Sequence, residues 1–118
     1  MKVIVAGGRD YQFTEQDYAF LDWFADEISE IVCGGATGAD ECGKQWAIRN
    51  SVPVKMFKAD WKTYGKAAGP IRNGQMAEYA DALILFPGGR GTDSMHQRAM
   101  TAGILIVDRR SNPTTASE

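Results

Sequence analysis

The residues best suited to chemistry in this chain are glycines, arginines and hydroxyls that follow short apolar runs. They form three clusters: Gly7, Gly8, Arg9 and Asp10; Gly34, Gly35, Thr37 and Gly38; and Pro87, Gly88, Gly89, Arg90, Gly91 and Thr92. Glycine lets backbone N–H groups approach an anion closely, and the start of a following helix favours negative charge. The third cluster therefore predicts a phosphate site in which the Thr92 hydroxyl and the first N–H groups of a helix hold the phosphate and Arg90 covers it.

Other charged side chains could complete such a site. The guanidinium groups of Arg72 and Arg9 can each pair bidentately with a phosphate, and the alternative for both is a solvated surface position. Asp10 and Asp40 are the loop carboxylates placed to meet a ribose hydroxyl or to act as a general base. We take Arg72 and Asp40 as the catalytic candidates.

Basic and aromatic residues alternate between Lys58 and Gly69. The segment contains Lys58, Lys62 and Lys66 together with Trp61 and Tyr64. Such a mixture can form a lid with a base-stacking surface, or it can be a packed surface excursion. It is also the one feature that suggests binding of single-stranded DNA, but the net charge of −2 argues against a nucleic-acid partner.

Short apolar runs alternate with helical patterns along the chain. Strands are predicted at 2–6, 30–33, 53–57, 82–86 and 104–107, and helices at 14–28, 39–50, 70–80 and 93–101. Thr14 with Asp17, Pro70 and Thr92 mark three of the helix starts. The alternation predicts a single Rossmann-like α/β domain: a five-stranded parallel sheet of order 3-2-1-4-5 with helices on both faces. Its glycine loops then share the edge where ligands bind.

Length and composition limit the alternatives. The 118 residues suffice for one domain, which we place at 1–108, followed by a flexible tail at 109–118. There is no run of roughly 20 apolar residues, so no membrane contact is expected. Two cysteines and one histidine argue against disulfides and against a metal site, and favour the cytoplasm. Neither the P-loop pattern nor the full Gly-x-Gly-x-x-Gly is present, so no cofactor is predicted.

Aromatic residues are concentrated in the first predicted helix. Trp23 and Phe24 there, and Trp46 in the second helix, fit core-facing stripes. The first helix nevertheless carries more apolar residues than one face can bury, which suggests a homodimer or a higher homo-oligomer.

A longer motif joins the third helix to the third glycine cluster. It has the form Arg72-Asn73-x-x-Met76-x-x-x-Ala80-Asp81-Ala82-x-Ile84-x-Phe86-Pro87-Gly88-Gly89-x-Gly91-Thr92. This closely resembles the LOG-type (lysine-decarboxylase-like) proteins of the SLOG superfamily, which is related to DprA. The chain is most similar to the short YspA-type branch, on the basis of Ala6 to Asp10, Ala59-Asp60-Trp61 and Gly69-Pro70-x-Arg72-Asn73.

This resemblance implies a domain that binds a nucleotide or a nucleotide-derived small molecule. The third glycine cluster would bind phosphate, and Arg72 would be the family's functional arginine, with Asn73 beside it. LOG enzymes hydrolyse the N-glycosidic bond of nucleoside 5′-monophosphates, but their motif continues to a glutamate where this chain has Met95, and Asn73 replaces their lysine. We therefore predict binding or sensing, with phosphoribohydrolase activity as the first alternative and DprA-like binding of single-stranded DNA as the second.

Overall fold

The computed structural model describes residues 1–110, which form five strands and a series of helices. The strands are β1 (Lys2–Ala6), β2 (Glu30–Cys33), β3 (Val54–Met56), β4 (Ala82–Leu85) and β5 (Leu105–Asp108). The α-helices are α1 (Glu15–Phe24), α2 (Ala39–Arg49), α3 (Trp61–Tyr64), α4 (Ala68–Tyr79) and α5 (Arg90–Ala102), and Ala25–Glu27 (η1) and Gly65–Ala67 (η2) are 3₁₀ turns. The strand boundaries agree with the sequence prediction to within one residue.

The strands form one parallel sheet in the order β3-β2-β1-β4-β5. Val3 at the centre pairs with Ile31 on one side and with Ala82 on the other. The order reverses beside β1, because the chain crosses from β3 at one edge to β4 on the far side of β1. The predicted three-layer α/β fold and strand order are confirmed.

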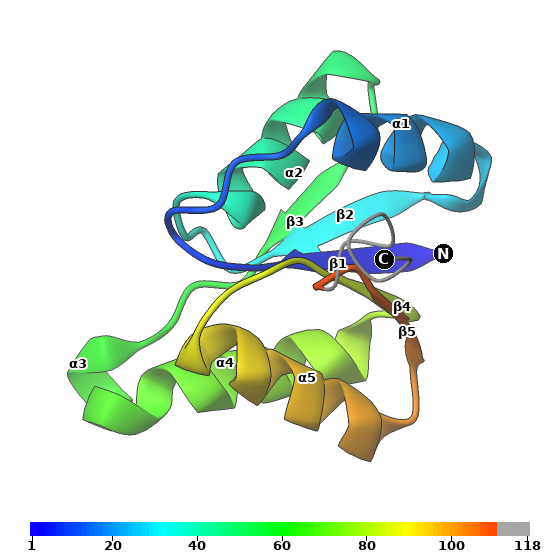
Figure 1. Cartoon of the computed structure of the whole chain (residues 1–118). Coiled ribbons are helices and arrows are strands. Elements are labelled where there is room, and N and C mark those ends of the chain that lie inside the picture. The colour runs from blue at the N-terminus through cyan, green and yellow to red at the C-terminus, as the bar shows by residue number, and fades with distance from the viewer. Residues whose placement is uncertain (111–118) are drawn as a thin grey trace, which may run out of the picture.

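Helices cover both faces of the sheet (Figure 1). The two cores follow from the alternation of side chains along β1: Val3 and Val5 pack under α1 and α2 with Leu21 and Trp46. Ile4 and Ala6 face the opposite way, in a core with residues of α4 and α5. All strands run in the same direction, so their carboxyl ends and the loops that follow share one edge of the molecule.

The helix-start signal predicted at Thr14 and Asp17 is confirmed for α1. The prediction that the aromatic residues of this helix face the core is partly wrong. The Thr14 hydroxyl accepts a hydrogen bond from the Asp17 N–H, and the Asp17 carboxylate accepts one from the Thr14 N–H. Trp46 is buried as expected, whereas Trp23 is 78% exposed. Trp23 and Leu21 point in different directions because residues two apart in a helix do not share a face.

Three predictions about the later helices need correction. Thr92 does not cap α5, because the helix begins at Arg90 and Gly89 is its N-cap. Helix α4 begins at Ala68, so Pro70 is its third residue, still within the first turn where no backbone donor is needed. Part of the segment predicted as a loop or lid is helical, since Asp60 caps α3 by accepting a hydrogen bond from the Thr63 N–H.

The first two residues of the predicted tail, Arg109 and Arg110, have defined contacts with the domain. Arg109 donates from its backbone to Leu85, and its guanidinium pairs with Asp17 at 3.2 Å. Arg110 pairs with Asp108 at 2.8 Å. The rest of that tail, 111–118, lies outside the described residues. None of the helices within 1–110 is both long and apolar enough to span a bilayer.

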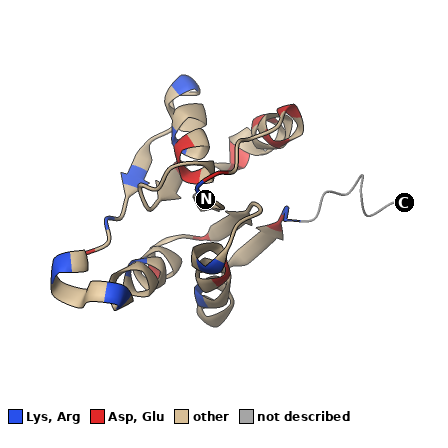
Figure 2. Ribbon diagram, turned by 60° about the vertical axis from the view of Figure 1, so that its left-hand side comes forward, with Lys and Arg blue, Asp and Glu red and all other residues tan. Residues whose placement is uncertain are grey.

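Acidic and basic residues are concentrated on different elements (Figure 2). Residues 14–30, which include α1, carry six acidic residues and no Lys or Arg, whereas residues 55–72, which include α3, carry four lysines and one arginine. The acidic surface therefore lies over α1, and the basic surface lies near the carboxyl edge of β3.

Candidate functional site

The three glycine loops touch one another at the carboxyl edge of the sheet. The Gly8 N–H donates to the Pro87 carbonyl at 2.8 Å, and the Ala39 N–H donates to the Gly8 carbonyl at 3.2 Å. Gly38 has φ +71, and a Cβ there would stand 2.2 Å from the Gly8 oxygen. Only glycine allows this contact, so part of the glycine excess serves to bring the loops together.

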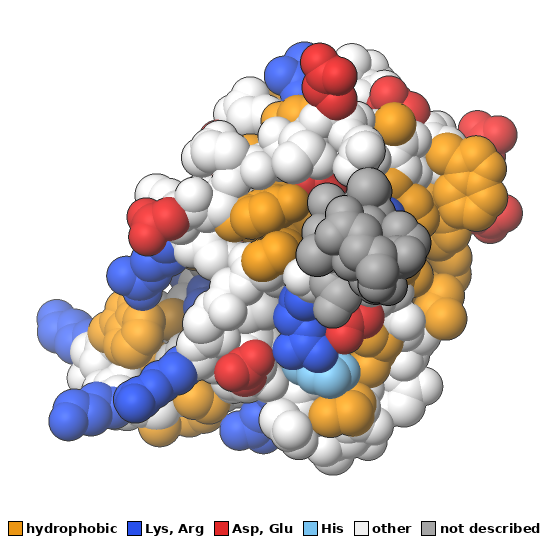
Figure 3. Space-filling model, viewed as in Figure 1, with side chains coloured by type: hydrophobic (Ala, Val, Ile, Leu, Met, Phe, Trp, Pro, Cys, Tyr) orange, Lys and Arg blue, Asp and Glu red, His pale blue; other side chains and the backbone are white. Residues whose placement is uncertain are grey.

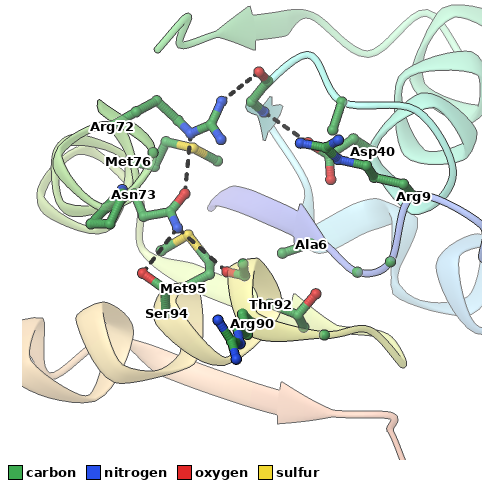
Figure 4. A pocket seen from close by; sticks show the side chains of 18 of the residues that line it. Ala6, Arg9, Asp40, Arg72, Asn73, Met76, Arg90, Thr92, Ser94 and Met95 are labelled. Atoms are coloured by element: carbon green, nitrogen blue, oxygen red, sulfur yellow. Dashed lines mark hydrogen bonds between the residues drawn. The ribbon is translucent and has the colours of Figure 1, made fainter. Parts of the chain in front are cut away.

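A cavity of about 500 Å³ opens between these loops and helices α4 and α5. Figure 4 shows the side chains of several elements directed toward it. Its charged lining residues are Arg9, Arg72, Arg90 and Asp40. Among the described residues that line the cavity, Asp40 is the single carboxylate. With three guanidinium groups against one carboxylate, the lining favours an anionic ligand.

The start of α5 forms one wall of the cavity and has no side-chain cap. The first N–H groups of a helix have no partner within the helix, and here a glycine precedes them. Added Cβ atoms at Gly89 and Gly91 would meet nothing within 4 Å. Packing therefore does not require glycine at either position. Because neither residue has a side chain, the start of the helix is open to the cavity.

Arg90 lies in this first turn and is exposed. Within residues 1–110 its side chain makes no hydrogen bond or ion pair. The hydroxyl of Thr92 lies against the third glycine loop, where a Cβ at Gly88 would approach it to 2.1 Å. Arg90 is thus available to a ligand, while Thr92, which is only 5% exposed, packs the loop.

Arg72 reaches across the cavity from α4 to the second glycine loop (Figure 4). Its Nη1 donates to the Gly34 carbonyl at 2.6 Å, and its Nε donates to the Asn73 side chain at 3.1 Å. A Cβ on Gly34 would lie 2.5 Å from that Nη1. Gly34 therefore makes room for the guanidinium, and Arg72 joins α4 to the loop after β2.

Asn73 continues the same chain of hydrogen bonds toward α5. It is buried, and its Nδ2 donates to the Gly91 carbonyl at 3.4 Å and to the Ser94 hydroxyl at 3.3 Å. Asn73 is thus bonded both to Arg72 and to the first turns of α5. The helix start that faces the cavity is held in place by α4.

Asp40 has the most strongly perturbed carboxyl group at the site. Burial, at 8% exposure, raises its pKa from the ordinary 3.8 to about 6, although the Gly34 N–H donates to it at 3.1 Å and Arg72 lies nearby. A carboxyl group with this pKa is ready to exchange a proton near neutral pH.

Trp61 and the start of α4 border the outer part of the cavity. Trp61 lines it together with Gly69 and Pro70. In Figure 3, Lys and Arg side chains surround an apolar patch over α3. Trp61 and Tyr64, 57% and 47% exposed, are the exposed aromatic residues of this region.

Most of the predicted site residues lie in the lining. They are Gly7, Gly8, Arg9, Gly34, Asp40, Arg72, Asn73, Gly89, Arg90, Gly91 and Thr92. Asp10, Gly35, Thr37, Gly38, Pro87 and Gly88 do not line the cavity, and Thr37 donates to the Arg9 carbonyl at 3.3 Å. For all the predicted site residues, inside or outside the lining, a role in ligand binding remains a prediction.

Sequence reasoning missed several lining residues. They are Val5, Ala6, Ala36, Gly69, Pro70, Met76, Ser94 and Met95. Met76 and Met95 are 2% exposed and also belong to the core beside α4 and α5, although the resemblance had already placed Met95 at the position of the LOG glutamate. Ser94 could have been found, because it lies one helical turn after Arg90 and so on the same face of the helix.

Comparison with known proteins identifies the family of the chain. Residues 1–64 match the family described as the YspA, cpYpsA-related SLOG family. The chain is also 32% identical over 126 aligned residues to the Gene 61 protein of Mycobacterium phage D29, which covers 95% of this chain and 98% of that protein. No solved structure gave a significant match.

Proposed function

Because the chain belongs to the YspA, cpYpsA-related SLOG family, we propose that it binds a nucleotide or nucleotide-derived ligand, as a binding or sensing module. The observation that carries this proposal is the open, uncapped start of α5 in a cavity whose lining has three arginines and one carboxylate. Unpaired N–H groups at a helix start and nearby guanidinium groups are the usual partners of phosphate.

The position of the cavity supports the same class of ligand. It lies beside β1, where the order of the strands reverses, and nucleotides bind parallel α/β sheets at this point. The ligand would place its phosphate against Gly89 to Gly91 with Arg90 over it. Its remaining part would extend between Arg72 and Arg9.

Calorimetry with ligand-free protein tests the proposal. The panel is AMP, ADP, ADP-ribose and inorganic phosphate, after any bound molecule has been removed by unfolding and refolding and identified by mass spectrometry. Arg90→Ala should weaken binding about tenfold or more, since a charge-assisted pair is lost. Arg98→Ala, on the same helix but outside the lining, should change nothing. The absence of heat with every member of the panel would reject nucleotide binding of this kind.

Hydrolysis of the N-glycosidic bond is the second candidate, and Asp40 is the observation in its favour. A buried carboxyl group at the cavity with a pKa of about 6 can act as a general base or acid. Met95, which occupies the position of the LOG glutamate, supplies no second carboxylate. Chromatography of AMP incubated with the protein should then show adenine, and Asp40→Asn should abolish its release. No adenine above that variant's background would eliminate this candidate for AMP.

A further inference from the structure

Trp61 is a large aromatic residue that the hydrophobic core does not use. It is 57% exposed, and within the described chain its ring pairs with no other aromatic ring and its Nε1 donates no hydrogen bond. Trp46 shows the opposite situation, because it is buried and its Nε1 donates to Asp22 at 2.9 Å. The exposure of Trp61 therefore has no explanation in the packing of the domain.

The position of Trp61 is nonetheless well defined. It is the first residue of α3, which Asp60 caps through a hydrogen bond of 3.1 Å from the Thr63 N–H. The edge of its ring lies over the first turn of α4, where an added Cβ on Gly69 would be 3.6 Å from Cη2. The ring therefore lines the cavity beside α4 while more than half of its surface stays exposed.

We propose that Trp61 stacks on the base of the bound nucleotide, so that this end of the cavity selects ligands that carry a base over base-free phosphates. The inference rests on the proposed function, because it needs a phosphate at the start of α5 to orient the ligand. Trp61 is then a specificity-determining residue, and the ligand class narrows to nucleotides whose base reaches α3.

The division of polar and aromatic groups in the lining supports this orientation. Arg90 and the open N–H groups are at α5, whereas Trp61, Gly69 and Pro70 provide a largely apolar surface at the other side. Every nucleobase has a face that can stack on an indole ring. Lys62 and Lys66, exposed beside Trp61, would add attraction for the anion without competing for the base.

Two probes that differ only by the base separate stacking from simple packing. AMP and ribose 5-phosphate share the phosphorylated sugar, and their affinities are measured for wild type, Trp61→Ala and Trp61→Phe. We expect Trp61→Ala to weaken AMP roughly tenfold, within the range that base–aromatic stacking supports, and to leave ribose 5-phosphate unchanged. Trp61→Phe should restore most of the AMP affinity. Trp23→Ala, an exposed tryptophan on α1, should affect neither probe.

Fluorescence gives an independent readout. In a Trp23→Phe background, whose remaining tryptophans are Trp61 and the buried Trp46, AMP should quench the emission and ribose 5-phosphate should not. Equal losses of both probes in Trp61→Ala, or no loss of either, would overturn the stacking role while leaving phosphate binding intact. Failure of both probes to bind the wild type would instead refute the proposed function for this ligand class.

Discussion

Replacing Asp40 with asparagine should remove a pH-dependent destabilisation of the folded state. The Asp40 carboxyl group is buried, and its pKa rises from 3.8 to about 6. Asparagine keeps an oxygen for the Gly34 N–H, which donates to Asp40 at 3.1 Å, but it cannot ionise. The comparison therefore isolates the cost of forming a carboxylate at this place.

The sign and size of the effect follow from proton linkage. Between pH 3.8 and pH 6 the folded protein retains the Asp40 proton while the unfolded chain releases it, so stability falls as the pH rises. Integrated from pH 4 to pH 7.5, this amounts to about 2 kcal/mol in the free energy of unfolding. Most of it is lost before the pH passes through the folded-state pKa.

Urea unfolding of ligand-free protein at constant ionic strength measures the effect at each pH. The quantity of interest is the stability of wild type minus that of Asp40→Asn, because any constant effect of the new amide cancels. It should fall by about 2 kcal/mol across the range. Asp10→Asn, which removes an exposed loop carboxylate, is the control for the loss of one charge.

A difference that stays within about 0.5 kcal/mol at all pH values would refute the argument that burial dominates at Asp40. A difference that rises with pH would contradict even the predicted sign of the effect. It would mean that Arg72 and the backbone donors stabilise the carboxylate more than burial opposes it.

Four further substitutions test packing, three of them around the cavity and one, at Arg109, just past β5. Gly88→Ala should cost about 1–3 kcal/mol in a thermal or urea unfolding experiment, because its Cβ would stand 2.6 Å from the Gly8 nitrogen. Gly91→Ala meets nothing within 4 Å, so stability should hold or rise by up to about 1 kcal/mol while the calorimetric affinity for AMP falls. Asn73→Ala should cost about 1–3 kcal/mol in urea unfolding, since it removes the hydrogen bonds that this buried amide makes to Arg72, Gly91 and Ser94. Arg109→Ala should cost about 2 kcal/mol, because it removes the 3.2 Å ion pair to the buried Asp17, and the same assay measures it.

The glycine clusters show how far a linear pattern can describe a site. Their positions after apolar runs were enough to predict a parallel sheet with its loops at one edge, because the fold rules for βαβ units leave few other arrangements. The pattern did not separate the two uses of glycine. Gly38 and Gly88 allow loops to touch, whereas Gly89 and Gly91 leave the start of α5 open. This distinction depends on the atoms opposite each Cα.

The amino-acid sequence by itself determined the order of the strands, the helices between them and the family, since these depend on local periodicity and motif spacing. Only the tertiary structure decided which polar groups share one cavity. Asp40 and Arg72 are 32 positions apart (72 − 40), yet both bond to Gly34. Trp61 lines the cavity and Trp46 packs in the core because of long-range packing, which no local spacing encodes.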